Sequence, residues 1–322
     1  MRAPVAKVLV VGAGAMGSLL GARFAAAGDR VTVVGRPDHV RAIREHGLRI
    51  DGIAPGSFSV IATTDLAEAE APDAVALAVK TYDLADVSAS LGRGLTRAVP
   101  LLLPQNGLHV EGPVAAALSL GGWGDPESWI VRAVNTIPAT LVAPGVVRQP
   151  GVGEITLPDP ASRGSASAAT SAWRAHLQRA GIEVRTVLDF ERELWRKALV
   201  NAAINPVTAL HRVPNGRLLD PPYRSEALGL LREAQRAAAT AGFVFTDREA
   251  DADLERVVRA TARNRSSMLQ DVERGRPTEI DAISGEIVMT AGARGIDLPR
   301  TREVIDRLHR ARPSSPEPAQ PS

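Results

Sequence analysis

The pattern of apolar and polar positions changes character once along the chain. In the first half, short apolar, β-branched runs such as Val5–Val11, Arg30–Val34 and Asp73–Val79 alternate with helical stretches. Such runs are typical of strands buried on both faces of a parallel sheet. From Phe190 onward only helical periodicity remains. We therefore expect an α/β fold: a Rossmann-type doubly wound domain, an all-helical domain and a disordered, proline-rich tail, at residues 1–188, 189–312 and 313–322.

Turn residues divide the rest of the sequence into further elements. Strands are predicted at Val99–Leu103, Trp129–Ile137, Leu141–Arg148, Gly153–Leu157 and Glu183–Val187, with a hairpin extension over Leu48–Ile61 and a helix over Ala168–Arg179. The Pro144–Gly145 turn indicates that Leu141–Arg148 and Gly153–Leu157 form a hairpin. Helices of the second half are predicted at Arg192–Ala203, Ser225–Ala241, Ala250–Arg274, Thr278–Ala293 and Thr301–Arg310.

A glycine-rich turn follows the first predicted strand. Gly12, Gly14 and Gly17 form the pattern G-x-G-x-x-G, with Ala15 and Met16 between the last two glycines. In such turns the first glycine permits a tight bend, the second lets the backbone approach a pyrophosphate, and the third lets helix and strand pack closely. The helix N-terminus adds N–H donors. In its strand–turn–helix–strand context, this motif predicts dinucleotide binding rather than a plain glycine turn.

The end of the second strand indicates which dinucleotide is preferred. An NAD-specific site usually offers an acidic side chain to the ribose 2′-hydroxyl there, but this chain has Arg36. A guanidinium can pair with a 2′-phosphate, which favours NADPH. The alternative is a solvated arginine in an arginine-rich chain. Asp38 is expected to be a helix N-cap or first-turn acid without a cofactor role.

Two polar tetrads follow later strands. Lys80–Asp83 comes directly after the predicted strand Asp73–Val79, and Pro104–Gly107 comes after Val99–Leu103. Ligands bind at the carboxyl ends of strands in open α/β sheets, so Lys80 and Asn106 are candidate site residues. An Asn-Gly pair alone usually marks only a turn, but two polar tetrads at successive strand ends are less easily explained in that way.

A polar stripe opens the helical half. Lys197, Asn201 and Asn205 are spaced by four residues in an otherwise apolar helix, and therefore share one face. Buried amide and ammonium groups are costly unless they are paired, so the stripe must meet another domain, water or a polar ligand. A structural seam between helices and a ligand site both satisfy this condition. Pro206 disfavours helical geometry at the preceding residue, which leaves open a kink at Asn205.

Two more clusters lie further along the helical half. Asn264, Ser267 and Asp271 have helical spacing and are expected on one face of the predicted helix Ala250–Arg274. Thr278 and Asp281 are expected to form a capping box, which places Glu279 in the first turn of the next helix. An acid in a first turn ordinarily serves the helix dipole, so a structural role for Glu279 is an equal alternative.

Composition excludes several classes of function. The 322 residues are 45% hydrophobic and 23% charged, with a formal charge of +2, as in ordinary globular proteins. Only 3% are aromatic and no basic run reaches five residues, so neither nucleic acid nor a membrane is an expected partner. The absence of cysteine excludes thiolate chemistry and fits a cytoplasmic location. The only lysines are Lys7, Lys80 and Lys197, and two of these fall in the motifs above.

Five motifs, in order along the chain, resemble those of the ketopantoate reductase (2-dehydropantoate 2-reductase) family, over about Val5 to Leu308. They are Lys80, Gln105–Gly107, the stripe Lys197/Asn201/Asn205, Pro214–Gly216, and Ser266–Asp271 continuing to Thr278–Asp281. The resemblance implies a Rossmann domain followed by an all-helical domain, with the active site in the cleft. It also implies NADPH-dependent reduction of 2-dehydropantoate, a small 2-oxo acid, to (R)-pantoate on the route to pantothenate and coenzyme A.

The resemblance also implies roles for individual residues. Lys197 matches the family's general acid, Glu279 its substrate-holding acid, and Asn106 an active-site asparagine that also contacts the cofactor. The implied substrate contacts are Asn201, Asn205, Asn264 and Ser267. The implied cofactor contacts are Gly12, Gly14, Ala15, Met16, Gly17, Arg36, Lys80 and Asn106. No metal is implied.

Two residues depart from the family's pattern. Asp83 stands where some members have glutamine near the cofactor. His109 stands where a glycine commonly follows the pattern Gln-Asn-Gly-x. The departure at Asp83 bears on the cofactor contacts. The departure at His109 leaves open a paralogous NADPH-dependent reductase of another branched 2-oxo acid, although a lone histidine more often only caps a loop. A non-catalytic NADP(H)-sensing protein is a further alternative, although binding alone would need neither Lys197 nor Glu279. A homodimer is left open, because no sequence feature decides the oligomeric state.

Overall fold

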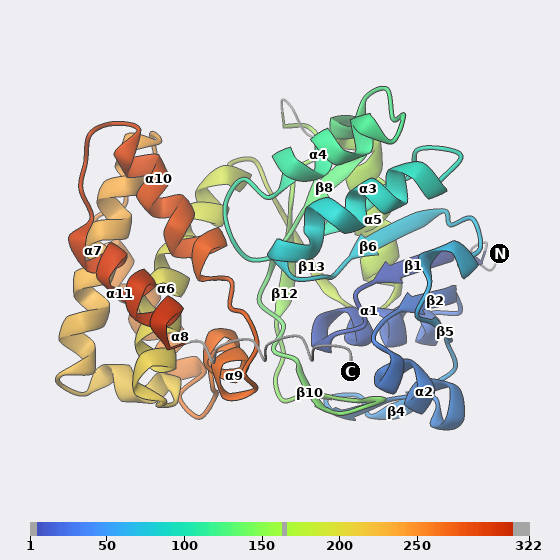
Figure 1. The fold of residues 1–322 in the computed structure, drawn as a ribbon, viewed down its shortest axis with the longest axis horizontal. Coiled ribbons are helices and arrows are strands. Elements are labelled where there is room, and N and C mark those ends of the chain that lie inside the picture. The colour runs from blue at the N-terminus through green and yellow to red at the C-terminus, as the bar shows by residue number, and fades with distance from the viewer. Residues whose placement is uncertain (1–4, 163–165, 312–322) are drawn as a thin grey trace, which may run out of the picture. The chain divides into compact units, whose positions relative to one another are not determined.

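The computed structural model describes residues 5–162 and 166–311. The chain forms two compact units, Met1–Phe190 and Glu191–Ser322 (Figure 1). The tail expected to be disordered at 313–322 lies outside the described residues.

A six-stranded parallel sheet forms the centre of the first unit, with the strand order β5-β2-β1-β6-β7-β8 (Figure 1). This is the order of a Rossmann-type doubly wound sheet, whose winding reverses between β1 and β6, so the predicted α/β fold class is confirmed. The strands are β1 Lys7–Val11, β2 Arg30–Val34, β5 Ile61–Thr63, β6 Ala74–Leu77, β7 Leu101–Leu103 and β8 Ile130–Arg132. The helices are α1 Ala15–Ala26, α2 Pro37–His46, α3 Leu84–Gly94, α4 Glu111–Leu120 and α5 Ser167–Arg179.

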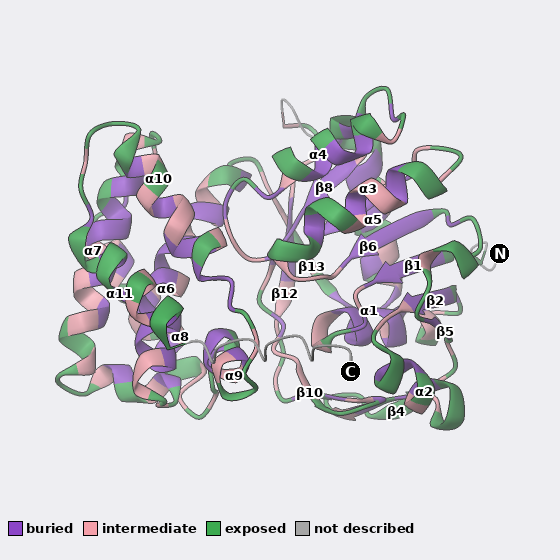
Figure 2. Ribbon diagram, in the orientation of Figure 1, coloured by how far each residue is buried: buried purple, intermediate pink, exposed green. Residues whose placement is uncertain are grey.

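The two faces of this sheet bury separate cores. Val8 and Val10 of β1 belong to a cluster that includes residues of α1 and α5. Leu9 and Val11 point the other way, into a cluster with α3 and α4. Side chains alternate along a strand, so β1 must be apolar at consecutive positions to fill both cores. Figure 2 shows β1 and β6 as buried, which explains the continuous apolar runs in the sequence.

Two smaller sheets complete the first unit. One has the order β10-β11-β3-β4 and the other β13-β12-β9. Their strands are β3 Leu48–Gly52, β4 Gly56–Phe58, β9 Val134–Asn135, β10 Thr140–Ala143, β11 Val146–Gln149, β12 Glu154–Pro158 and β13 Glu183–Val187. The expected hairpin between Leu141–Arg148 and Gly153–Leu157 is wrong, because the Pro144–Gly145 turn folds β10 back on β11. β12 instead pairs with β13 in parallel and with β9 in antiparallel fashion.

The second unit is helical. Its helices are α6 Phe190–His211, α7 Tyr223–Thr240, α8 Asp247–Ala260, α9 Ser267–Glu273, α10 Glu286–Gly292 and α11 Pro299–Arg310, with α6 starting at the last residue of the first unit. α6 runs through Pro206 without a break, so Asn205 stays helical. Ile280 packs with Ala209 of α6, Met268 of α9 and Leu308 of α11 in one buried cluster. No helix among the described residues is long and apolar enough to cross a membrane.

The prediction of a single helix over Ala250–Arg274 is wrong. α8 ends at Ala260, where the Thr261 hydroxyl donates to the Val257 carbonyl at 2.7 Å. α9 begins anew at Ser267, and the Ser266 hydroxyl accepts a hydrogen bond from the Leu269 N–H at 3.1 Å. Hydroxyl side chains that bond the local backbone compete with helix continuation, which explains the interruption.

Candidate active site

The glycines of the first turn have distinct environments. Gly12 has φ of +100°, and a Cβ there would lie 2.5 Å from the backbone nitrogen of Val79. A Cβ at Gly17 would lie 2.1 Å from the Gly12 carbonyl oxygen, whereas one at Gly14 would meet nothing within 4 Å. Gly12 and Gly17 are therefore required by packing. Gly14 presents an open backbone face, which is the space a pyrophosphate needs.

The N-terminus of α1 lies at this open face. Gly14 is the N-cap, Ala15 and Met16 form the start of the helix, and the first turn has neither a side-chain cap nor an acidic residue. The first N–H groups of a helix have no intrahelical partner, and they carry the positive end of the dipole. An uncapped, acid-free helix start beside an open glycine fits the phosphates of a dinucleotide.

Arg36 is the N-cap residue of α2 and is exposed. Asp38 lies in the first turn of α2, where its carboxylate pairs with Arg41 at 2.6 Å. Asp83 ends the short 3₁₀ turn η2 (Thr81–Asp83). Burial raises the pKa of Asp83 above its ordinary value, while the positive charge of Arg36 opposes this rise. The charge of Arg36 and that of Asp83 therefore influence each other.

Lys80 and Asn106 follow the neighbouring strands β6 and β7 at one edge of the sheet, and both are half-buried. Gln105 lies beside them and is 7% exposed. Its Nε2 donates to the carbonyls of Leu77 and Val79, the latter at 3.2 Å. Gln105 therefore ties the end of β7 to the end of β6 and orders the edge that carries both predicted site residues.

Arg132 also shapes this edge and was not identified from the sequence. Its side chain is 7% exposed and donates to the Gly107 carbonyl at 3.1 Å and to Glu111 Oε2 at 2.7 Å. It thereby fixes the loop that follows Asn106. A lone arginine inside an apolar strand pattern is a signal that could have identified it, because a charge in that setting needs paired partners. His109 lies in the same loop, exposed and with a positive φ of 55°.

In the second unit, the polar stripe lies on α6 as the spacing predicts. Lys197 and Asn201 are half-buried, and Asn205 is 6% exposed. In the described part of the chain, the carboxamides of Asn201 and Asn205 make no hydrogen bond to another residue. Buried amides are nearly always paired, so these two groups are suited to a polar ligand.

The residues Asn264 and Ser267 do not share a helix face, which corrects the sequence prediction. Asn264 lies in the loop between α8 and α9, where its carbonyl accepts from the N–H of Asn215 at 3.0 Å. Ser267 is exposed in the first turn of α9. The neighbouring Ser266 is buried and its hydroxyl receives a hydrogen bond from Thr208 of α6 at 2.7 Å. This bond places the Ser266–Ser267 turn beside the end of the α6 stripe.

The expected capping box of Thr278 and Asp281 is absent. The Thr278 hydroxyl is buried without a partner, and Asp281 pairs with His309 at 3.0 Å. This helical segment starts instead with a π-helical turn, η5 (Asp281–Gly285). Glu279 lies just before this turn and is 7% exposed. π turns occur often at functional sites. Glu279 is thus a buried acid outside the helix rather than a solvated residue in its first turn.

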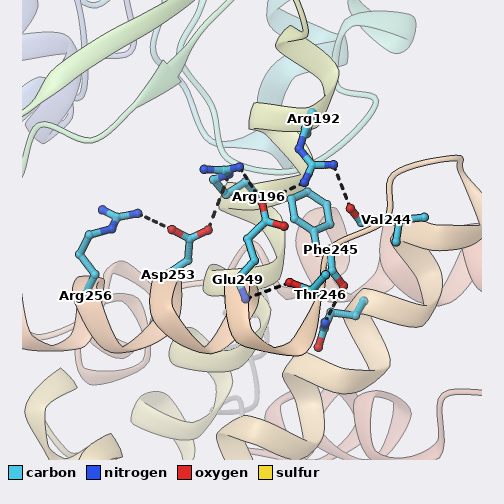
Figure 3. A network of polar contacts seen from close by, with 9 residues as sticks. Arg192, Arg196, Val244, Phe245, Thr246, Glu249, Asp253 and Arg256 are labelled. Atoms are coloured by element: carbon cyan, nitrogen blue, oxygen red, sulfur yellow. Dashed lines mark hydrogen bonds and ion pairs between the residues drawn. The ribbon is translucent and has the colours of Figure 1, made fainter.

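A charged network holds α6 against α8 (Figure 3). Arg192 and Arg196 both donate to Glu249 Oε1, at 2.8 and 2.9 Å. Arg196 also lies 3.7 Å from Asp253, which pairs with Arg256 at 2.8 Å. The network therefore ties the turn of α6 directly before Lys197 to the start of α8.

Comparisons with known proteins agree with these features. A family model described as ketopantoate reductase PanE/ApbA matches residues 8–162, and one described as its C-terminal part matches residues 189–312. The 2-dehydropantoate 2-reductase of Archaeoglobus fulgidus is 35% identical over 305 residues, covering 94% of this chain and 96% of the relative.

Solved structures show the same fold over nearly the whole chain. A PanE/ApbA family ketopantoate reductase from Ralstonia eutropha JMP134 has a TM-score of 0.83 and 27% identity, covering 95% of this chain and 98% of that one. D-mandelate dehydrogenase in its ternary structure with NADH and anilino(oxo)acetate has a TM-score of 0.85 with the same coverage, but its 22% identity makes this a likeness of fold alone. From both family models and the relative matched over nearly its full length, this chain belongs to the ketopantoate reductase PanE/ApbA family of oxidoreductases.

Proposed function

We propose that this protein reduces 2-dehydropantoate to (R)-pantoate with NADPH. In this proposal residues 1–188 bind the cofactor, and residues 189–312 bind the substrate. The observation that carries the proposal is the stripe on α6, where Lys197 is followed by the unpaired carboxamides of Asn201 and Asn205. A cationic proton donor beside two unpaired amides suits a small anionic substrate with a carbonyl group.

The proposed chemistry assigns a separate task to each group. NADPH supplies the hydride for the carbonyl carbon when it is bound. The Lys197 ammonium stabilises the negative charge that develops on the carbonyl oxygen and then donates the proton to it. Asn201, Asn205, Asn264 and Ser267 hold the substrate's carboxylate and hydroxyl groups. Glu279 accepts a hydrogen bond from the substrate, and Asn106 is the active-site asparagine that also contacts the cofactor.

The proposed cofactor site uses the edge of the parallel sheet. The open face at Gly14 and the start of α1 receive the pyrophosphate, with Gly12, Ala15, Met16 and Gly17 forming the rest of the turn. Arg36 pairs with the 2′-phosphate, and Lys80 contacts the cofactor beyond β6. The NADH in the D-mandelate dehydrogenase structure supports a pyridine nucleotide in this fold, and Arg36 supports the phosphorylated form.

The test is the loss of NADPH absorbance with 2-dehydropantoate, compared with a panel of other branched 2-oxo acids. Lys197→Ala should lower kcat roughly a thousandfold, within the usual range for a general acid. Lys197→Arg is the matched variant, because it keeps the charge but donates a proton poorly. Recovery of full kcat in Lys197→Arg would exclude proton donation and leave only charge stabilisation.

The same panel tests the alternatives. Faster turnover of another branched 2-oxo acid would favour the paralogous reductase, which the departure at His109 allows. Binding of NADPH with no reduction of any acid would favour a sensing protein. Arg36→Asp should weaken NADPH binding far more than NADH binding. An equal loss for both dinucleotides would contradict the assignment of Arg36 to the 2′-phosphate.

A further inference from the structure

A buried histidine joins three segments of the first unit. His39 lies on α2 and is 5% exposed. Its Nε2 is 2.9 Å from the hydroxyl of Ser18 on α1. Its Nδ1 accepts a hydrogen bond from the backbone N–H of Gly145, also at 2.9 Å, in the turn between β10 and β11. Both ring nitrogens are therefore engaged by different elements.

The partners fix the tautomer of the ring. A backbone N–H can only donate, so Nδ1 must be the acceptor and the proton must lie on Nε2. The Nε2–H group then donates to the Ser18 hydroxyl oxygen. Burial lowers the pKa of His39 below its ordinary value of 6.5, which keeps the ring neutral at physiological pH. Only the neutral ring satisfies both partners.

The three joined segments bear directly on the cofactor residues. Ser18 follows Gly17, and its N–H donates to the Gly14 carbonyl at 3.0 Å in the first turn of α1. His39 lies one helical turn beyond Arg36, whose carbonyl accepts from the N–H of Val40 at 3.0 Å. The ring thus connects the glycine turn to the helix start that carries Arg36.

The hairpin turn supports α2 from another direction. Gly145 has φ of +75°, and a Cβ there would lie 3.2 Å from the Cβ of Ala42 on α2. The turn and the helix are therefore in close contact around the Gly145–His39 bond. The hairpin braces α2, while the Ser18 bond sets the position of α2 relative to α1.

We propose that His39 is a positioning residue for cofactor choice. By holding α2 to α1 through Ser18, it keeps Arg36 at the distance from the glycine turn that a 2′-phosphate and a pyrophosphate on one dinucleotide require. This inference rests on the proposed function. Loss of the bond should weaken NADPH binding more than NADH binding, because NADH lacks the 2′-phosphate with which Arg36 is proposed to pair.

Two substitutions distinguish the contributions of the hydrogen bonds made by the two ring nitrogens. His39→Gln places an amide N–H near the position of Nε2 and can keep the bond to Ser18, whereas His39→Asn places an amide oxygen near Nδ1 and keeps only the bond to Gly145. We expect His39→Asn to raise the Kd for NADPH about tenfold, which is the loss expected for one buried hydrogen bond. His39→Gln should raise it less than threefold.

Ser18→Ala provides an independent variant that leaves the ring in place. It should reproduce the NADPH defect of His39→Asn, and the double variant should be no worse than either single one, because both remove the same bond. The kcat at saturating NADPH should stay within about twofold of the wild type. His46→Gln, at an exposed histidine on the same helix, is the matched control and should change neither Kd.

The outcomes distinguish this inference from the proposed function. Equal weakening of NADPH and NADH in His39→Asn and Ser18→Ala would mean that the bond is only structural, and would overturn the inference. Unchanged NADPH binding in Ser18→Ala, with a normal wild type, would also overturn it while leaving the proposed function intact. A wild type that binds no NADPH and reduces no 2-oxo acid would instead refute the proposed function on which the inference rests.

Discussion

The two units hold their proposed functional helices in contrasting ways. In the first unit, one neutral ring that is 5% exposed links α2 to α1 and to the turn between β10 and β11 through two hydrogen bonds. In the second, α6 is held by a network of charges, and the side chains of Arg192, Arg196 and Glu249 are each about 30% exposed. The contribution of the buried ring to stability is sensitive to substitution but not to salt. The contribution of the charged network is spread over several side chains and is screened by solvent.

The free energy of unfolding should depend more on His39, with its two buried hydrogen bonds, than on any single side chain of the charged network. His39→Leu would leave the Gly145 N–H and the Ser18 hydroxyl buried without partners, and each such group costs about 1–3 kcal/mol. We expect the free energy of unfolding to fall by about 3 kcal/mol in urea titrations. His46→Leu on the same helix is the control and should change stability by less than about 0.5 kcal/mol. An equal fall in the free energy of unfolding for the two variants would show that the hydrogen bonds of His39 add nothing to stability.

Removing the central acid of the charged network, Glu249, should lower the free energy of unfolding by less than the loss of His39 does. Glu249→Ala takes the shared acceptor from Arg192 and Arg196, but both guanidinium groups can still reach water. We expect the free energy of unfolding to fall by about 1 kcal/mol at low ionic strength. The fall should be smaller in 1 M salt, where the Debye length is about 3 Å. A loss that does not change with salt would mean that packing, rather than charge, holds α6 to α8.

The sequence predicted the parts of this molecule that depend on local spacing. The glycine turn and the α6 stripe were predicted correctly, because Gly12, Gly14 and Gly17 and the steps from Lys197 to Asn205 fix their geometry within a few residues. No comparison tests the roles proposed for these residues, which remain predictions.

Long-range contacts accompany the features that the sequence did not predict. The break between α8 and α9 is accompanied by the bond from Thr208 to Ser266, 58 residues away. The expected capping box is replaced by the pairing of Asp281 with His309, 28 residues away. His39 reaches Gly145 across 106 residues, a separation at which no spacing rule operates. Periodicity carries no information about such contacts.

Acid should weaken the first unit through two histidines, His39 and His176, whose pKa values are lowered in the folded chain. Burial lowers the pKa of His39 below 6.5, so the unfolded chain takes up this proton at a higher pH than the folded one. The stability that the neutral ring contributes is therefore present above pH 6.5 and is lost as the pH falls through the folded pKa. His176, whose pKa burial and Arg179 also lower, adds a loss of the same sign.

Substitution separates these two contributions. His39→Gln removes one titrating group, so its unfolding free energy should fall less steeply below pH 6.5 than that of the wild type. The remaining slope should be that of His176, together with any acids that titrate in this range. Chemical denaturation at a series of pH values provides the measurement. An unchanged slope in His39→Gln would mean that His39 takes up its proton over the same pH range in the folded and unfolded chains, which contradicts the lowering of its pKa by burial.

The smallest expected effect concerns the acid that interacts with Arg36. The carboxylate of Asp83 is close enough for Arg36 to influence its pKa, so its negative charge competes with a 2′-phosphate for the same guanidinium. Asp83→Asn should therefore tighten NADPH binding roughly twofold to threefold, as expected for a partly screened charge, with no change for NADH. Asp38→Asn, which affects an acid paired with Arg41 on the same helix as Arg36, is the control. Weaker NADPH binding in Asp83→Asn would instead indicate that Asp83 orients Arg36 toward the phosphate, and that α2 is held in place by a charge as well as by a neutral ring.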